Sequence, residues 1–327
     1  TAVNGTEFKA VKSPTGAEKP ELANYTPTKA EVEAKTGVTA TEATAAKIDL
    51  ALSKVAALNG FTVTTDKTKI EVSAAGVYAI KAEETGFTYK TATAYVGFGE
   101  PYPTLTNAAV TAKKSPTSVD KTVADDDHVV AIGDIVTYTI EAYVPFIDAA
   151  NTDNRTFTIT DTPTGMKITD IKVKVGNDDL QAGTDYTLDK TLPSTEAVTV
   201  NFATDYIGTE NTHAGKTVTV EVTATVTEAG KYSNEAKTNK ASDPSKVEGE
   251  TGSITINKVD KGNNVLKGAE FSVALDGTKL EFVEVETGVY RLATADDAAD
   301  TKVTNVVATN GTVVVKGLDE GTYKIVE

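Results

Sequence analysis

The sequence predicts a mainly β protein made of three tandem immunoglobulin-like antiparallel β-sandwich domains, the first with an inserted α-helix. The first reason is that Thr and Val alternate along several segments, as they do in strands that bury one face. The clearest of these segments are Ile135–Val144, Thr156–Thr160, Thr217–Val226 and Thr312–Lys316. The second reason is that turn signals, such as Val175–Asp179 and Asp276–Gly277, separate the segments at short intervals. Many short strands at regular spacing are typical of such sandwiches.

An Ala-rich segment between Thr39 and Asn59 departs from this alternation. Its apolar residues recur at helical spacing, at Ile48, Leu52, Val55 and Leu58. Thr39 and Glu42 make a capping box, and Asn59 is followed by Gly60, a common end for a helix. The segment therefore predicts an α-helix around residues 40–58, which we expect to cover one sheet of the first domain.

Two breaks in the strand pattern suggest domain boundaries. Prolines occur in Gly99–Pro103, shortly before the first boundary, and the polar segment Lys240–Gly252 is typical of a linker. We expect an N-terminal domain at residues 1–112, a middle domain at 113–244 and a C-terminal domain at 250–327. We also expect the chain to be a fragment that stops inside its last domain.

The composition argues against several functions. The 32 basic and 47 acidic residues give a net charge of −15, which disfavours nucleic acid as a partner. No apolar run is long enough to insert into a membrane. Without cysteine, and with only two histidines, the chain has little material for metal or enzyme chemistry. The acidic segment Asp125–His128 lacks the Gly and distal Glu of a calcium loop. We expect no enzyme activity toward other molecules, no cofactor and no metal.

Three ordered motifs at the C-terminal end resemble the prealbumin-like B-type module of Gram-positive surface proteins. They are a strand that carries Lys, a GAEF strand and an "E-box" ending in Glu, at Gly252–Asp260, Leu266–Phe271 and Gly317–Glu327. The middle domain resembles the larger module that precedes it in pilins, through Val119–Val123, Gly133–Ile140, Thr158–Met166, Gly183–Tyr186 and Tyr232–Ala236. The chain as a whole resembles a backbone (major) pilin of a sortase-assembled Gram-positive pilus.

The resemblance implies an intramolecular isopeptide bond in the middle domain. Matched to the family's motifs, Lys121 is the amine, Asn234 the amide and Asp161 the helper acid. Burial would favour a neutral, nucleophilic lysine and a protonated acid, which are the forms that this reaction needs. The bond would close a loop of 113 residues (234 − 121) and join the first strand of the domain to its last. The alternative is a surface Lys, a turn Asn and a strand-end Asp.

The outer domains match the cross-linking motifs less completely. In the C-terminal domain Lys258 and Glu327 match the amine and the E-box acid, and the partner Asn is expected on a strand beyond this chain. In the first domain Gly76–Ala82 aligns with an E-box but has Ala82 in place of Glu. We expect no isopeptide bond in the first domain.

A second kind of lysine is implied between the first two domains, where pilins carry a YPK-type motif that accepts the next subunit. The corresponding segment here has Thr111 and Ala112 in place of Tyr and Pro. Lys113 or Lys114 is therefore the expected sortase acceptor, and the alternative is an ordinary linker lysine.

The resemblance implies a structural shaft subunit of a secreted pilus attached to the cell wall. Its expected partners are other copies of the same chain, joined head to tail, and a pilin-type sortase. Minor pilins and host surface molecules are further expected partners. The alternative function is a cell-wall-anchored adhesin that binds a host matrix protein or glycoprotein.

Overall fold

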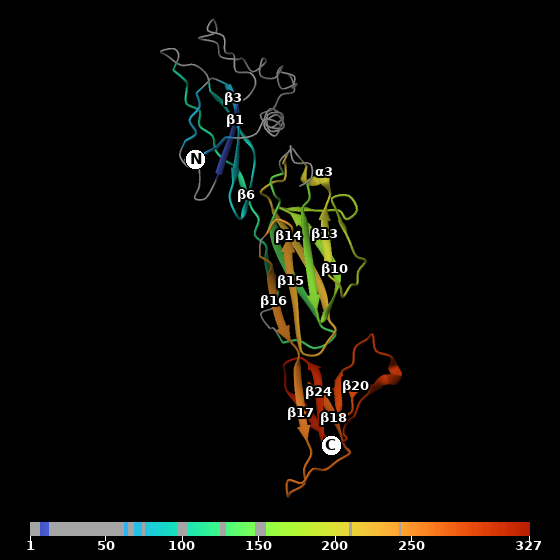
Figure 1. Cartoon of the computed structure of the whole chain (residues 1–327). Coiled ribbons are helices and arrows are strands. Elements are labelled where there is room, and N and C mark those ends of the chain that lie inside the picture. Colours follow the sequence, from blue (N-terminus) through green and yellow to red (C-terminus); the bar gives the residue numbers. More distant parts are fainter. Residues whose placement is uncertain are drawn as a thin grey trace.

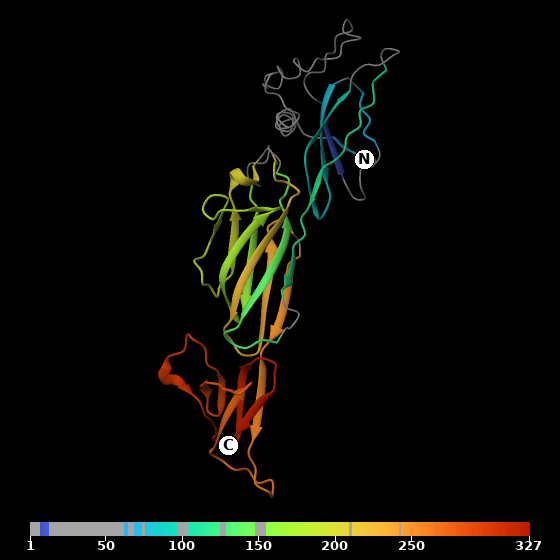
Figure 2. The ribbon, with the colours of Figure 1, turned by 180° about the vertical axis from the view of Figure 1, so that it is seen from behind.

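The computed structural model describes residues 7–12, 62–64, 69–73, 76–96, 104–124, 129–147, 155–208, 211–241 and 243–327. Three groups of β-sheets follow one another along an elongated molecule (Figure 1), and the view from behind shows the same order (Figure 2). The predicted mainly β class is confirmed. No helix in the described ranges is long and apolar enough to cross a membrane.

The first group is a four-stranded sheet with the order β2-β1-β3-β5. Its strands are β1 (Glu7–Lys12), β2 (Thr62–Thr64), β3 (Gly76–Glu83) and β5 (Ala92–Val96). A separate pair joins β4 (Phe87–Tyr89) to β6 (Lys114–Pro116), so a strand that follows the first group returns to pair with it. The helix predicted at 40–58 lies outside the described residues.

The middle group is a sandwich of two five-stranded sheets, with the orders β11-β10-β14-β8-β7 and β12-β13-β9-β15-β16. The first sheet contains β7 (Asp120–Val123), β8 (Ile135–Tyr143), β10 (Met166–Val175), β11 (Asp178–Asp179) and β14 (Thr217–Val226). The second contains β9 (Thr158–Thr164), β12 (Tyr186–Leu188), β13 (Val198–Phe202), β15 (Lys231–Thr238) and β16 (Ser245–Glu250). A one-turn helix, α3 (Thr204–Ile207), follows β13.

The alternation that predicted these strands decides which side chains enter the core. In β14, Val218, Val220, Val222 and Ala224 are buried, and the threonines between them are only partly covered. Successive side chains of a strand point to opposite faces, so one face of β14 packs inward against the second sheet. A single apolar cluster, which includes Tyr138 and Phe157, fills the space between the two sheets.

The predicted linker at Lys240–Gly252 is partly wrong, because residues 245–250 form β16. This strand pairs along β15, from Lys231 opposite Glu250 to Ala236 opposite Ser245. Its sequence is polar because β16 is an edge strand, and Val247 is its one side chain that packs against the apolar cluster. As a consequence, β15 is not the last strand of the middle sandwich.

The third group is a smaller sandwich with its own apolar core. One sheet has the order β17-β24-β21-β20-β22, formed by β17 (Gly252–Asn257), β20 (Phe282–Glu286), β21 (Val289–Leu292), β22 (Lys302–Val303) and β24 (Thr312–Leu318). The other contains β18 (Ala269–Leu275), β19 (Thr278–Lys279), β23 (Val306–Ala308) and β25 (Tyr323–Val326), with β25 pairing to β18. A 3-10 turn, η3 (Ala299–Thr301), precedes β22.

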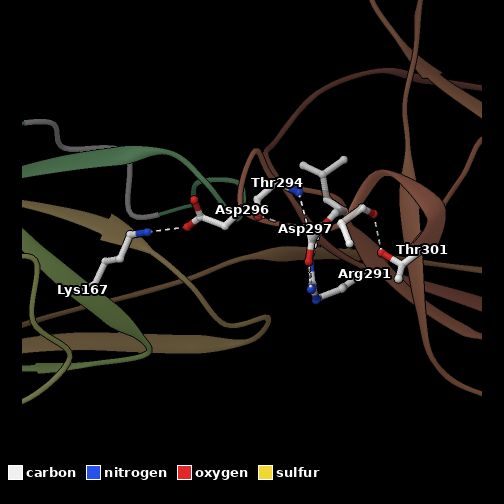
Figure 3. Close-up of polar contacts among 8 residues, drawn as sticks. Lys167, Arg291, Thr294, Asp296, Asp297 and Thr301 are labelled. Atoms are coloured by element: carbon white, nitrogen blue, oxygen red, sulfur yellow. Dashed lines mark hydrogen bonds and ion pairs between the residues drawn. The ribbon is translucent and has the colours of Figure 1, made fainter.

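The middle and third sandwiches are joined by direct contacts. Only Thr251 separates β16 from β17, and the Ile132 N–H donates to the Gly317 carbonyl at 3.0 Å. Gly317 has φ +80, and a Cβ built there would lie 2.4 Å from Ile132 Cδ1, so only glycine fits at this approach. The Lys167 ammonium also reaches Asp296 across the junction (Figure 3), at 2.5 Å.

The loop that carries Asp296 is itself held by its neighbour Asp297. The Arg291 guanidinium donates to both carboxylate oxygens of Asp297, at 2.5 and 2.8 Å. The backbone N–H of Thr294 donates to the same carboxylate at 2.7 Å (Figure 3). A two-pronged guanidinium–carboxylate contact fixes both position and orientation, so this loop faces the middle sandwich in one arrangement.

Candidate functional site

A polar cluster lies inside the middle sandwich, where its two sheets meet at one edge. Lys121 comes from β7, the edge strand of one sheet, and Asp161 and Asn234 come from the neighbouring strands β9 and β15 of the other. In the register of β9 and β15, Asp161 is opposite Ala236 and Asn234 is opposite Pro163. Asp161 and Asn234 are therefore diagonal neighbours on the inward face. The structure thus brings all three predicted residues into the same core.

These three polar residues are unusually well buried. Their exposed fractions are 5% for Lys121, 2% for Asp161 and 0% for Asn234. The Lys121 Nζ lies 2.5 Å from Asp161 Oδ1. Removing an ion pair from water costs several kcal/mol, and such a pair on its own is weak support for stability. A contribution to stability therefore does not explain why these three polar groups are buried.

Burial shifts both partners toward their neutral forms. It lowers the pKa of the Lys121 ammonium, and the Asp161 carboxylate only partly offsets this effect. Burial likewise raises the pKa of Asp161, against the opposing influence of the Lys121 charge. The directions favour a neutral amine beside a protonated acid, which is the protonation pattern of a nucleophile and its general acid.

Tyr138 and Ser245, which were not predicted as site residues, position Lys121. The Tyr138 ring lies below the amine, with its centroid 4.7 Å from Nζ, and its side chain is fully buried. The backbone N–H of Lys121 donates to the Ser245 hydroxyl of β16 at 2.9 Å, which holds β7 against the opposite sheet. In the sequence, Tyr138 is only one residue of an alternating strand, and Ser245 belongs to the predicted linker, so neither could be recognised as part of the site.

Three atoms of the cluster are buried without a hydrogen-bond partner. They are Asp161 Oδ2 and both side-chain polar atoms of Asn234, Oδ1 and Nδ2. Each buried polar atom that lacks a partner costs roughly 1 to 3 kcal/mol. Because buried polar groups are nearly always satisfied in folded proteins, this concentration at one place makes the cluster the candidate functional site.

The pair predicted in the third domain has a different environment. The Lys258 ammonium and the Glu327 carboxylate form an ion pair, and their side chains are 26% and 49% exposed. Glu327 follows β25, and Lys258 follows β17. The structure brings the predicted amine and acid together, but in a partly solvated position rather than in a core.

The two predicted acceptor lysines differ in their surroundings. The Lys113 side chain is exposed, and its amine has no ion-pair partner among the described residues. Lys114 is only partly exposed, and its Nζ lies 3.2 Å from Glu84 Oε2 and 3.6 Å from the centroid of the Phe87 ring. These two lysines are equivalent candidates in the sequence, whereas the structure gives them different surroundings.

No metal centre emerges from the described part of the chain, where no group of three or more His, Asp or Glu residues gathers in a ligating arrangement. The acidic segment Asp125–His128 lies outside the described residues.

Comparison with known proteins places this architecture among pilins. The structure is similar to the T6 backbone pilin of serotype M6 Streptococcus pyogenes, which has a modular three-domain structure (TM-score 0.58, 15% identity, 99% of this chain and 74% of that chain). It is also similar to the major pilin SpaD of Corynebacterium diphtheriae (TM-score 0.50, 20% identity, 99% and 78% of the two chains). No curated protein sequence matches the chain significantly.

The chain therefore has the modular, mainly β fold of the backbone pilins of Gram-positive pili. Within it, residues 252–327 match the family model SpaA, described as a prealbumin-like fold domain.

Proposed function

We propose that this protein is a structural shaft subunit of a covalently polymerised cell-surface pilus. The observation that carries the proposal is the Lys121–Asp161–Asn234 cluster, which sits buried and incompletely hydrogen-bonded inside a backbone-pilin fold. The protein is then secreted and attached to the Gram-positive cell wall, with other copies of itself, minor pilins and host surface molecules as its partners.

The cluster has the composition needed to form an isopeptide bond by itself. The neutral Lys121 Nζ attacks Asn234 Cγ while the protonated Asp161 polarises the Asn234 carbonyl. The Cγ–Nδ2 bond breaks, and Nδ2 leaves as ammonia with one proton from the lysine amine. The new amide keeps one N–H, which donates to Asp161 Oδ1. The Asn234 carbonyl then accepts from the Asp161 hydroxyl.

This reaction accounts for all three unpartnered atoms of the cluster. Nδ2 leaves the protein, and the Asn234 Oδ1 and Asp161 Oδ2 atoms become acceptor and donor of one hydrogen bond. The product contains no lysine amine and keeps Asp161 protonated, so neither group has to be buried as an ion. In the third domain, Lys258 and Glu327 are the candidate amine and acid of a second bond.

Head-to-tail linkage uses a lysine at the junction of the first two sheet groups. A pilin-type sortase holds the preceding subunit as an acyl-enzyme, and only an accessible amine can attack it. Lys113 and Lys114 are the candidates, because they lie between the first sheet group and β7, the first strand of the middle sandwich.

The test is a ladder of covalent polymers from cells that express the protein, separated after boiling in detergent. Wild type is expected to give a ladder, and Lys113→Arg/Lys114→Arg is expected to give monomer only, because a guanidinium keeps its charge but is not a nucleophile. Lys174→Arg, at an exposed lysine of the middle sandwich, is the matched control and should leave the ladder unchanged. Absence of a ladder in wild type contradicts a shaft subunit and favours the adhesin alternative.

A further inference from the structure

Lys113 and Lys114 are adjacent in sequence but face different surroundings. Lys114 lies in β6 and pairs with Tyr89 of β4, and the Lys113 carbonyl accepts a hydrogen bond from the Lys90 N–H at 2.9 Å. Successive residues of an extended chain point to opposite sides. The backbone pairing therefore fixes which lysine turns toward the first sheet group and which turns toward solvent.

The amine of Lys114 contacts Glu84 and Phe87 of the β3–β4 hairpin, and Tyr89 contacts Glu84. We call Glu84, Phe87 and Tyr89 the lysine clamp. Glu84 Oε2 accepts from Lys114 Nζ at 3.2 Å, and the Phe87 ring centroid lies 3.6 Å from the same nitrogen. The Tyr89 hydroxyl donates to the same Glu84 oxygen, which holds the carboxylate in place. The clamp offers the ammonium an anion on one side and a π-face on another.

We propose that the lysine clamp selects the sortase acceptor, by withdrawing Lys114 and leaving Lys113 as the one reactive amine of this pair. The selection rests on the proposed pilus function. An acyl acceptor needs a free lone pair on its nitrogen and space for the acyl-enzyme around it. The contacts of the Lys114 amine with Glu84 and Phe87 occupy part of that space. Lys113 reaches solvent from a backbone that β4 and β6 hold in place.

A sortase-independent labelling experiment tests the clamp directly. Wild-type protein is treated briefly with N-hydroxysuccinimidyl acetate, and acetylation of each lysine is followed by peptide mass spectrometry. Lys113 is expected to react about tenfold faster than Lys114, since an ion pair and a cation–π contact together are worth about that factor. Equal rates in the wild type overturn the proposal.

Variants of the clamp sharpen this experiment. Glu84→Gln/Phe87→Leu is expected to bring the Lys114 rate to within about twofold of the Lys113 rate, because both contacts are lost. Glu83→Gln is the matched control, since it removes the same charge from the adjacent exposed position and should keep the difference. A Lys114 rate that stays low in the clamp variant contradicts a role for these side chains.

Ladder formation in cells tests the selection of Lys113 independently of the proposed shaft function. Lys113→Arg alone should abolish the ladder, and Lys114→Arg alone should leave it intact. A ladder that survives Lys113→Arg, or that disappears with Lys114→Arg, overturns the selection while the shaft function stands. A wild type without polymers contradicts the shaft function, and the labelling rates still decide whether the clamp shields Lys114.

Discussion

Lys121 and Asp161 come from opposite sheets of the middle sandwich, and their charged groups meet at 2.5 Å in a core that leaves their side chains 0% and 3% exposed. Neither strand needs a charge at that place for its own pairing. The two residues share the site with Asn234, whose amide has no hydrogen-bond partner there. This relationship gives the following predictions about chemistry and stability.

The first prediction concerns the mass of the folded protein. Intact-mass measurement should fall short of the sequence mass by one ammonia, and digestion should yield a peptide that links Lys121 to Asn234. Asn234→Ala should have its full calculated mass, because it offers no leaving group. A wild-type mass equal to the sequence value would rule out the bond.

The second prediction separates the bond from the ion pair. Asn234→Ala loses the cross-link of a 113-residue loop (234 − 121), for which a chain-entropy estimate gives roughly 4 to 5 kcal/mol of unfolding free energy. Asp161→Ala should also have its full mass, and it should unfold at a lower denaturant concentration than Asn234→Ala, because it strands the buried Lys121 without a partner. If Asp161→Ala still loses ammonia, a different carboxyl is the helper acid.

The third prediction is a bell-shaped dependence of bond formation on pH, followed as ammonia release during refolding. The reactive pair is a neutral lysine and a protonated acid, which together hold one proton, as the ion pair does. A second proton blocks the amine on the acid side, and loss of the shared proton removes the acid on the alkaline side. Burial raises the pKa of Asp161 above 3.8 and lowers the pKa of Lys121 below 10.5, so both limbs should fall inside those values. A rate that climbs steadily through pH 10.5 contradicts a role for the acid.

The fourth prediction concerns the contact between the middle and third sandwiches. Gly317→Ala should lower the unfolding free energy by about 2 to 4 kcal/mol, because its Cβ meets Ile132 in addition to the positive-φ strain. Gly277→Ala is the control, since its φ is +82 with nothing within 4 Å, and it should cost only about 1 kcal/mol. In an Ile132→Ala background, Gly317→Ala should cost less than it does in the wild type, because the side chain that the new Cβ meets is gone. Equal costs for the two glycines would show that the approach of Ile132 is unimportant.

The fifth prediction compares two adjacent aspartates. Asp297→Asn should cost roughly 2 kcal/mol in thermal unfolding, because it breaks the two-pronged contact with Arg291. Asp296→Asn should cost at most about 0.5 kcal/mol, since its side chain is 76% exposed. The Arg291 contact holds the pKa of Asp297 below its usual value. Its contribution should therefore be complete above pH 3.8 and be lost progressively as the pH falls below that value. Similar costs for the two variants would contradict this ranking.

Much of the fold could be predicted because strand alternation is a local property. The inward residues of β14, for example, follow from its Thr–Val alternation alone. The edge strand β16 could not be found in this way, because it needs few apolar residues to pair along β15. A polar edge strand and a linker have similar compositions.

The site was predictable through its resemblance to pilins, and its geometry was not. Lys121, Asp161 and Asn234 lie far apart in sequence, and they meet only because β9 pairs with β15 and the sheet that contains β7 packs against theirs. The difference between the surroundings of Lys113 and those of Lys114 could not be predicted from the sequence either. It depends on Glu84 and Phe87, which are separated from the lysines by a return of the chain from β4 to β6.

The position of β16 has a consequence for how the subunit carries load. With the proposed bond in place, a load entering at Lys113 crosses from Lys121 to Asn234 and then passes through the rest of β15 and β16 to the third sandwich. These 16 residues (250 − 234) lie outside the cross-linked loop. The open end of the β15–β16 hairpin is the pair Lys231–Glu250, so the load from the third sandwich enters β16 at Glu250. Asn234 is opposite Val247, and the pairs of β16 with β15 must separate before the segment can extend. The segment from residue 235 to residue 250 is thus a reserve of length, roughly 50 Å when fully extended, in a shaft whose middle sandwich is otherwise cross-linked.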